Sequence, residues 1–400
     1  MLDFQTIAAI IFLFILALFV FMNRKKLDTK FLIPYFLYFS MYKTTWGLKL
    51  MDSMSKKYKK VFIYIGYFGI AVGFLGMILI SYGLLNNIYM LFTKPQAAPG
   101  VGLVLPIKAK GVFFVPFFYW IISIFVIAVV HEFSHGLIAR AHNVKVKSSG
   151  FAFLGVIIPI IPAAFVEPDE KELRKKSHKE QLSVFAAGPL SNIAIAFLFL
   201  AIAAFVLAPI TNAVIEPNGV KVTDYVKESI AYPAEKAGIK IGEIIQQADN
   251  TLTPYRDNLS EVLRSKKPGD IVTIKTDKSV YEIRLAKNPE NETQAYMGAY
   301  LEQSAKIKDN IKKNYGELLP DAVIWAYGLM VILFVLNIGI GLFNLAPIGP
   351  LDGGRMLQLP LEKYFGREKG NKIWGYTGLF FLVIILINIG AGFGLFKVFM

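Results

Sequence analysis

Six long apolar segments dominate the chain. They cover about residues 5–22, 61–92, 111–130, 181–209, 321–343 and 373–398. Each approaches the roughly 20 apolar residues that a helix needs to cross about 30 Å of hydrocarbon. The pattern therefore predicts a polytopic α-helical membrane protein with about six transmembrane segments. The first segment is expected to be an uncleaved anchor, because it lacks the basic start of a signal peptide.

The charged residues between these segments predict the orientation of the chain. Residues 23–60 contain ten Lys and Arg residues but only two Asp residues. Cytoplasmic loops are enriched in Lys and Arg, so this segment is expected inside and the N-terminus outside. Counting spans from there places about 211–318 outside and the loop 361–372 inside. The stretch 31–42 is too short to span and contains Pro34, so it is expected in the membrane interface.

Residues 211–303 differ from the rest of the chain in their mixed charge and short alternating runs. VTIKT (272–276) and VYEIRLA (280–286) alternate as strands do. NLSEVLRSK (258–266) has helical spacing, with Asn258 as the expected N-terminal cap. These features predict one small α/β domain inserted between the fourth and fifth spans.

Composition and charge narrow the class of protein further. Apolar residues make up 55% of the chain and charged residues only 18%, which is too little charge to cover a water-soluble surface. The net charge of +14 favours contact with anionic membrane lipid over nucleic acid in a protein of this kind. Cysteine is absent, so a transition metal would have to be bound by histidine and carboxylate groups.

The sequence HEFSH follows the third apolar segment and contains His131, Glu132 and His135. Two histidines four positions apart on a helix lie about 40° apart around its axis and about 6 Å apart along it. Both imidazoles can therefore reach one zinc ion, and Glu132 can take a proton from water activated there. Such groups are costly to bury at the end of a span, which favours a functional site over a pair of interfacial histidines.

A catalytic zinc ion takes three protein ligands, so the two histidines leave one ligand to be found. Asp352 is the strongest candidate, because it is the only acidic residue between Asp321 and Glu362. It lies in NLAPIGPLDGG (344–354), whose Pro and Gly residues predict irregular backbone at membrane depth. Such backbone is tolerated mainly where it lines a cavity. The alternative is a loop that leaves the bilayer, with Asp352 capping a helix.

Together, the two motifs resemble those of the site-2 protease family of intramembrane zinc metalloproteases. The family pattern HExxH is followed, in a later span, by N-x-x-P-x-x-x-x-D-G, which here begins at Asn344 and has its spacing intact. The resemblance implies that His131, His135 and Asp352 bind Zn²⁺ and that Glu132 is the general base.

The segment GPLSN (188–192) also resembles an element of this family. The resemblance implies that Asn192 and Asn344 face the substrate or the oxyanion. Hydrogen bonding between helices is the alternative for each of these amides.

Within the inserted domain, YPAEKAGIKIGEIIQQADN (232–250) resembles an element of protease-associated PDZ domains. The resemblance implies that Gly238 and Gly242 form turns and that Ala234 and Ile239 enter the core. A PDZ domain between the two catalytic motifs is typical of one branch of the family.

The segment 150–168 contains three prolines in its last ten residues, which excludes a regular helical span. At this place the family has a membrane-embedded β-hairpin, whose exposed strand edge could pair with an unwound substrate segment. A loop packed on the catalytic helix is the alternative.

The expected organisation has four parts. They are N-terminal transmembrane segments (1–92), the first part of a catalytic core (93–210), a PDZ-like domain (211–303) on the extracytoplasmic side, and the second part of the core (304–400). His142 and His178 are not expected to bind metal, because His142 should lie in the cytosolic interface and His178 in a charged, solvated run.

The expected function is that of an integral-membrane zinc endopeptidase that cleaves transmembrane segments of single-pass membrane proteins. Its partners would be these substrates and membrane lipid, and no nucleic acid is expected. Three alternatives remain. A membrane protease with a Glu ligand lacks a Glu in an apolar span, and a metal transporter lacks repeated intramembrane carboxylates. A catalytically idle PDZ scaffold would need no general base, so the intact Glu132 argues against it.

Overall fold

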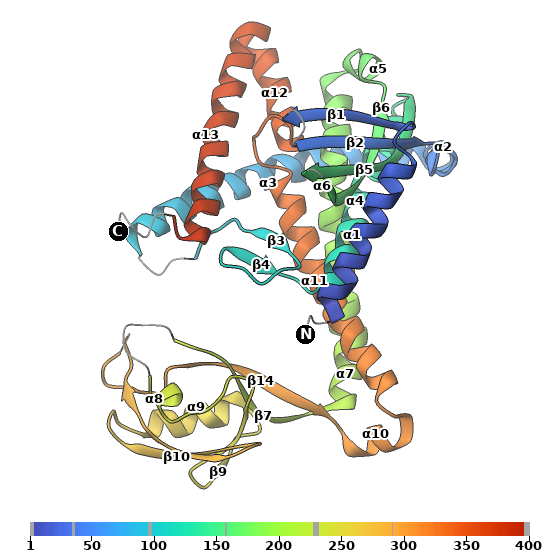
Figure 1. Ribbon diagram of the computed structural model, residues 1–400. Coiled ribbons are helices and arrows are strands. Elements are labelled where there is room, and N and C mark those ends of the chain that lie inside the picture. Colours follow the sequence, from blue (N-terminus) through green and yellow to red (C-terminus); the bar gives the residue numbers. More distant parts are fainter. Residues whose placement is uncertain are drawn as a thin grey trace. The chain divides into compact units, whose positions relative to one another are not determined.

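The computed structural model describes residues 4–33, 37–94, 98–156, 158–226, 232–289 and 291–395. The chain folds into two compact units (Figure 1). The first unit combines Met1–Ile202 with Leu329–Met400, and the second contains Ala203–Gly328. The second unit is therefore an insertion in the chain of the first.

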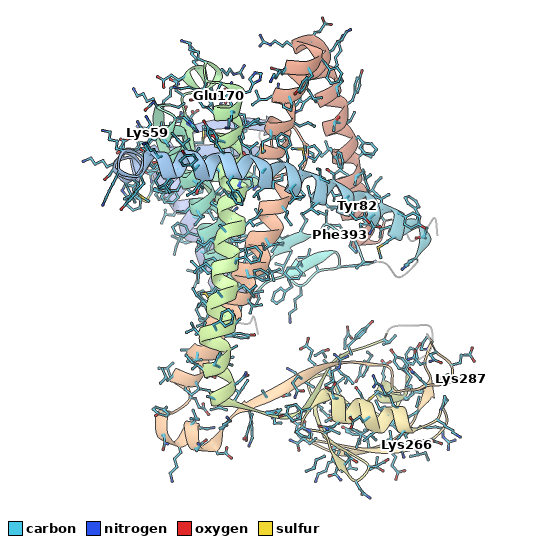
Figure 2. All side chains as sticks on the ribbon, turned by 180° about the vertical axis from the view of Figure 1, so that it is seen from behind. Lys59, Tyr82, Glu170, Lys266, Lys287 and Phe393 are labelled. Atoms are coloured by element: carbon cyan, nitrogen blue, oxygen red, sulfur yellow. The ribbon has the colours of Figure 1, made fainter. Side chains whose placement is uncertain are left out.

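Six helical segments of the described residues are long and apolar enough to cross a membrane. Five of them are single helices: α1 (Phe4–Met22), α3 (Lys59–Thr93), α4 (Phe117–Ala141), α11 (Leu318–Phe343) and α13 (Arg367–Phe393). The remaining segment, His178–Val214, is continuous and consists of α6 (His178–Ala201), the π-helical turn η1 (Ile202–Leu207) and α7 (Ala208–Val214). They match the six predicted spans, although the end of the last one, 396–398, lies outside the described residues. In α1 only Leu16 is buried, and Tyr82 of α3, labelled in Figure 2, is 68% exposed.

The third helix begins and ends later than predicted. Residues 111–116 are not helical, because Val112–Phe114 forms strand β4, which pairs in parallel with β3 (Leu103–Leu105). The indole N–H of Trp120 donates to the carbonyl of Val104 at 2.9 Å and holds this pair against the start of α4. The helix then continues to Ala141, so that HEFSH lies inside it.

A four-stranded antiparallel sheet lies beside these helices. Its strands are β1 (Leu27–Ile33), β2 (Leu37–Thr44), β5 (Val146–Val156) and β6 (Ile158–Pro168), in the order β1-β2-β5-β6. The sequence indicated only an interfacial segment at 31–42, whereas most of its described residues belong to strands. Pro34 itself lies outside the described residues. The strand β6 lies at one end of the sheet order, and residues of this strand contact α4.

Three shorter helices complete the first unit. They are α2 (Leu48–Lys57), α5 (Glu170–Arg174) and α12 (Asp352–Phe365). The loop predicted at 361–372 is instead the end of α12 and the start of α13, which meet at Gly366. This glycine adopts φ +76°, a left-handed conformation that lets two helices join through one residue.

Glycines of α3 allow α6 and α12 to approach it closely. A Cβ atom added to Gly66 would lie 3.0 Å from Cβ of Ser183, and one added to Gly73 would lie 2.6 Å from Cε of Met356. Small residues at helix contacts are the usual way in which membrane helices gain van der Waals packing. This packing brings α4, α6 and α12 together around one small region.

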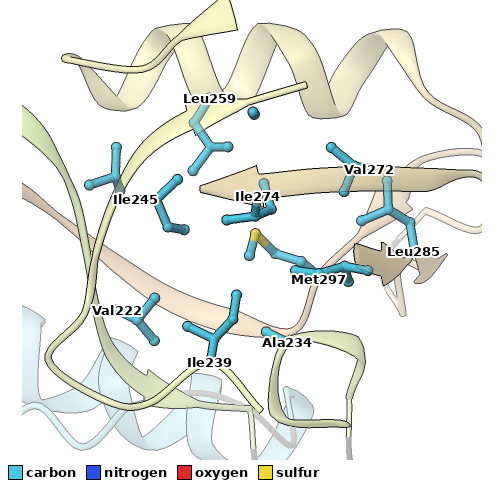
Figure 3. Close-up of a cluster of buried hydrophobic side chains, with 12 residues drawn as sticks. Val222, Ala234, Ile239, Ile245, Leu259, Val272, Ile274, Leu285 and Met297 are labelled. Atoms are coloured by element: carbon cyan, nitrogen blue, oxygen red, sulfur yellow. The ribbon is translucent and has the colours of Figure 1, made fainter. Parts of the chain in front are cut away.

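The second unit is an α/β domain, with strands in the order β11-β10-β8-β7-β14 and β9 added beside β8. Its elements are β7 (Ile215–Tyr225), α8 (Pro233–Lys236), β8 (Ile244–Ala248), β9 (Thr251–Leu252), α9 (Arg256–Ser265), β10 (Ile271–Thr276), β11 (Val280–Arg284), β12 (Ala286–Lys287), β13 (Ala295–Tyr296), β14 (Ala299–Ile307) and α10 (Asp309–Tyr315). Its core includes Ile245, Leu259 and Ile274 (Figure 3).

Several sequence predictions for this domain are confirmed. The two predicted strands correspond to β10 and to β11 with β12. Gly238 and Gly242 adopt φ +83° and +97°, and Ala234 and Ile239 are fully buried.

The predicted cap of α9 is wrong. The helix begins at Arg256, and Asn258 is its third residue, whose Oδ1 accepts a hydrogen bond from the backbone N–H of Tyr255 at 3.2 Å. The amide of Asn258 thus acts from inside the helix on the N–H of the cap residue Tyr255, and the helix begins three residues earlier than predicted.

The longest strand pair of the domain joins its two ends. The strands β7 and β14 pair from Ile215 with Ile307 to Tyr225 with Ala299. Lys308 closes the pair, because its Nζ donates to the carbonyls of Asn212 and Ala213 at the end of α7.

Candidate metal centre

The two histidines of HEFSH and Asp352 meet at one point. Nε2 of His131 lies 3.0 Å from Oδ2 of Asp352, and Nε2 of His135 lies 3.3 Å from the same oxygen. The two Nε2 atoms are 3.1 Å apart. Helical spacing brings the histidines onto one face of α4, as predicted, and the fold adds the carboxylate from 217 residues beyond (352 − 135).

The turn before α12 places Asp352. The backbone N–H of Gly353 donates to the carbonyl of Asn344 at 2.8 Å, which folds the segment 344–351 back onto the start of the helix. A Cβ atom on Gly353 would lie 2.1 Å from the carbonyl oxygen of Leu345, and one on Gly354 would lie 2.1 Å from that of Ile348. Close backbone contact therefore requires glycine at both positions that follow Asp352.

Groups on α6 orient both imidazoles. Nδ1 of His135 donates to the carbonyl of Val184 at 2.7 Å, which leaves its Nε2 with a free lone pair. Nδ1 of His131 faces the amide of Asn192 at 3.1 Å, and Asn192 is fully buried. Asn192 therefore lies against a histidine ring, whereas the sequence resemblance implied that it faces the substrate.

The amide of Asn192 also indicates the protonation of His131. Its Nδ2 is the atom placed toward His131, and its buried Oδ1 has no hydrogen-bond partner. The assignment of amide O and N follows from the hydrogen-bond network. A half-turn of the amide would let Oδ1 accept from Nδ1–H of His131 and would satisfy the orphaned oxygen. The Nε2 atom of His131 would then also carry a lone pair.

These atoms fit a zinc ion. Two Nε2 lone pairs and a carboxylate oxygen converge on one point, an arrangement that a bound cation stabilises. In a tetrahedral site with ligand bonds of about 2.0 Å, two ligand atoms are about 3.3 Å apart, close to the distances observed here. Two histidines and one carboxylate also match the ligand set of hydrolytic zinc sites, in which one position stays open.

Glu132 and Asn344 line the same cavity as His131, His135 and Asp352. The cavity has a volume of about 270 Å³ and is also lined by Val166 and Arg355. Oε2 of Glu132 accepts a hydrogen bond from the backbone N–H of Val166 in β6 at 3.0 Å. The carboxylate of Glu132 is thus held in the same cavity as the two histidines and Asp352.

Gly188 lies directly against the two imidazoles. A Cβ atom added there would be 2.4 Å from Nε2 of His135 and 2.6 Å from Nε2 of His131. Sequence reasoning noted GPLSN only as a resemblance and missed this contact. It also missed the carbonyl of Val184 and the N–H of Val166, because backbone groups carry no residue-specific signal.

A His-His-Asp group that could hold a metal ion, among helices apolar enough to span a membrane, is the arrangement expected of a membrane metalloprotease, and comparison with known proteins agrees. The model of peptidase family M50 matches residues 119–385, about two thirds of the chain. The chain therefore belongs to peptidase family M50, the site-2 protease family, and is an integral multi-pass membrane protein of the metalloprotease type.

Individual relatives extend over different parts of the chain. An uncharacterized protein of Methanocaldococcus jannaschii is 26% identical over 320 residues, covering 79% of this chain and 75% of that protein. A zinc metalloprotease of the same archaeon is 40% identical over 67 residues, covering 17% of this chain and 20% of that protein. The PDZ domain of an SdrC-like protein from Listeria monocytogenes is 21% identical, covering 24% of this chain and 92% of that domain, with a TM-score of 0.18.

Proposed function

We propose that the protein is an active zinc endopeptidase that cleaves transmembrane segments of single-pass membrane proteins. The observation that carries this proposal is the convergence of His131, His135 and Asp352 beside Glu132 in one cavity at the end of an apolar helix. The metal ligands alone do not distinguish a structural metal site from a catalytic one. A carboxylate that can accept a proton beside an open coordination position indicates hydrolysis.

The residues of this chain divide the work of hydrolysis. A zinc ion in the site would supply Lewis acidity and lower the pKa of the attacking water. Glu132 accepts the proton of that water and returns it to the leaving amine. Val184 and Asn192 keep the imidazoles oriented, as outer partners of metal-binding histidines do. Asn344 lines the cavity, and an amide donor at this place would stabilise the developing oxyanion.

The edge of β6 supports an extended substrate. Because Val166 directs its N–H away from β5 to Glu132, the alternation of a strand directs the N–H and C=O of Ala164 to the same free edge. A peptide added there would make strand hydrogen bonds immediately beside the general base. Only an unwound segment can pair in this way, so the substrate helix must open locally before it is cleaved.

The surroundings of β6 support an apolar substrate. A cavity of about 150 Å³, lined by Trp46, Phe133 and Phe165, reaches Glu132 from the side of the sheet. A neighbouring cavity of about 360 Å³ lies among α1, α4 and the sheet, and its lining is almost wholly apolar. Side chains of a transmembrane segment can occupy such surfaces without losing hydrogen bonds to water.

We also propose that the PDZ-like domain faces the extracytoplasmic side and receives part of the substrate there. The ten Lys and Arg residues of 23–60 support this orientation. Membrane lipid surrounds the exposed apolar side chains of the long helices.

The decisive experiment compares Glu132→Gln with the unchanged protein, purified in detergent and given a single-span substrate. Cleavage should be lost while zinc is retained, because glutamine is nearly isosteric but cannot accept the proton. Glu368→Gln is the matched control, since this acid is exposed at the start of α13 and pairs only with Lys372 among described residues. Equal cleavage by Glu132→Gln would refute the mechanism.

The same assay tests the substrate class. Replacing two leucines of the substrate span by glycine should accelerate cleavage, because the helix then opens at lower cost. If zinc-loaded protein binds single-span proteins but never cleaves them, the chain is a scaffold and the proposed activity is wrong.

A further inference from the structure

His142 is a buried histidine that the reaction does not use. It follows the last residue of α4, and 4% of its surface is exposed. Its Nε2 lies 2.8 Å from Oγ of Ser183, and its Nδ1 lies 3.6 Å from Oε1 of Glu180. The ring of Tyr67 covers it at 5.8 Å between centroids. Both ring nitrogens of His142 thus face groups of α6.

Three histidines contact α6 in antiparallel order: His131 and His135 within α4, and His142 at its C-terminal cap. His131 faces Asn192, His135 donates to Val184, and His142 bonds to the neighbouring Ser183. We call these three contacts the histidine ladder. Seven residues separate His135 from His142, which is about two helical turns and about 10.5 Å, so both rings lie on nearly the same face of α4.

Besides the histidine ladder, Oγ of Ser191 donates to the carbonyl of Val130 in α4 at 3.4 Å, but its shorter hydrogen bond, at 2.7 Å, is to the carbonyl of Gly188 within α6. The side chains that pack between the two helices include the small residues Ala139 and Ala187, with Ile138 and Val184 beside them, and Gly188 lies against the two imidazoles. Small side chains let helices approach closely, but they provide shallow ridges that resist sliding weakly. A directional hydrogen bond between the helices is therefore well suited to set their register.

We infer that His142 is a positioning residue for the metal centre. Its hydrogen bond to Ser183 fixes α6 along α4, and this places the next carbonyl, that of Val184, against His135. Through the same helix it places Asn192 against His131. The inference rests on the proposed metal site and deepens it, because it assigns the outer contacts of the two ligands to a residue outside HEFSH.

The test uses zinc affinity in full-length protein that also carries Glu132→Gln, so that proteolysis plays no part. His142→Ala and Ser183→Ala should each weaken zinc binding about tenfold, within the range typical of outer contacts of metal ligands. The double variant should bind zinc no more weakly than either single variant, because both substitutions remove the same hydrogen bond. Ser183→Ala is the milder change, because it removes only a hydroxyl group, and it carries the test if His142→Ala fails to fold.

Two conservative variants separate positioning from mere packing. Glutamine places its terminal amide where Nε2 of histidine lies, whereas asparagine places its amide where Nδ1 lies. His142→Gln should therefore restore zinc affinity to within about twofold, and His142→Asn should not. His178→Ala is the control, because His178 is exposed at the first position of α6.

A cobalt spectrum supplies a readout that stability alone does not change. Cobalt(II) bound in the site should show a shifted visible absorption band in His142→Ala and a normal band in His142→Gln and His178→Ala. Unchanged zinc affinity and an unchanged band in both His142→Ala and Ser183→Ala would overturn the inference while leaving the proposed function intact. A protein that binds no zinc even with His142 present would overturn the metal centre itself.

Discussion

Gly188 offers the sharpest test of the metal centre, because a single methyl group there would occupy the space of the ligands. The added Cβ of Gly188→Ala would lie 2.4 Å from Nε2 of His135 and 2.6 Å from Nε2 of His131. Both are the nitrogen atoms that would bind zinc. The substitution is otherwise favourable, since alanine is the better helix former by about 1 kcal/mol.

The size of the effect follows from these distances. Ordinary contact with a carbon atom begins at about 3.5 Å, so the imidazoles or α6 must move by about 1 Å. Ligand distances in a zinc site tolerate about 0.2 Å. Two of three ligands are affected together, so we expect zinc affinity to fall by at least about 100-fold, which corresponds to about 2.8 kcal/mol.

The assay is competition for zinc with a coloured chelator in detergent, with a thermal melt to check the fold. Gly339→Ala is the matched control, because Gly339 lies in the apolar helix α11 and an added Cβ would have no atom within 4 Å. The control should bind zinc normally. Zinc affinity of Gly188→Ala within about threefold of the unchanged protein would refute the geometry of the site.

Three further predictions concern the ligand, acid stability and orientation. Zinc content should be near one per chain and should fall in Asp352→Ala, measured by elemental analysis; full occupancy there would remove Asp352 from the ligand set. Burial, together with Lys176 and Lys59, lowers the pKa of His142 although Glu180 opposes this. As pH falls, His142 is therefore protonated in the unfolded chain at a higher pH than in the folded protein. The free energy of unfolding should decrease as pH falls through about 6.5, the unfolded pKa, toward the lower folded pKa. Thermal melts between pH 5 and 8 should show this decrease, and His142→Gln should reduce it. The sequons at 258–260 and 291–293 should be accessible to lumenal glycosylation in a eukaryotic host. In sealed right-side-out cells, added protease should not cut 141–149. Reversed accessibility of the two regions would overturn the orientation.

The sequence predicts most of the helices, because length and apolarity suffice to recognise a span. It does not predict the hairpin of β1 and β2. Its second strand, β2, pairs with β5, more than 100 residues later, and a non-local pairing leaves little trace in a short apolar run interrupted by Pro34. The sequence also predicts a loop where α12 and α13 meet, since a helix break at one glycine resembles a longer connection.

The site is predictable to the extent that it consists of motif side chains. His131, Glu132, His135 and Asp352 meet as their spacing and chemistry suggest. What orients them is not predictable in the same way, because it consists of backbone groups on α6 and β6. Asn192 is recognisable as part of a motif, yet only the fold reveals that it lies behind a ligand.

The paired strands β7 and β14 have a mechanical consequence. The two strands part at Ile215 and Ile307, at the end where each continues into a helix of the chain. A force that draws these two points apart would break the residue pairs of β7 and β14 one after another, starting at Ile215 and Ile307. A shearing force along the strands would instead load all the pairs at once. The clamp of Lys308 on Asn212 and Ala213 would carry the load first. The attachment of the domain would thus yield to a small pull at its base, although its core would remain folded.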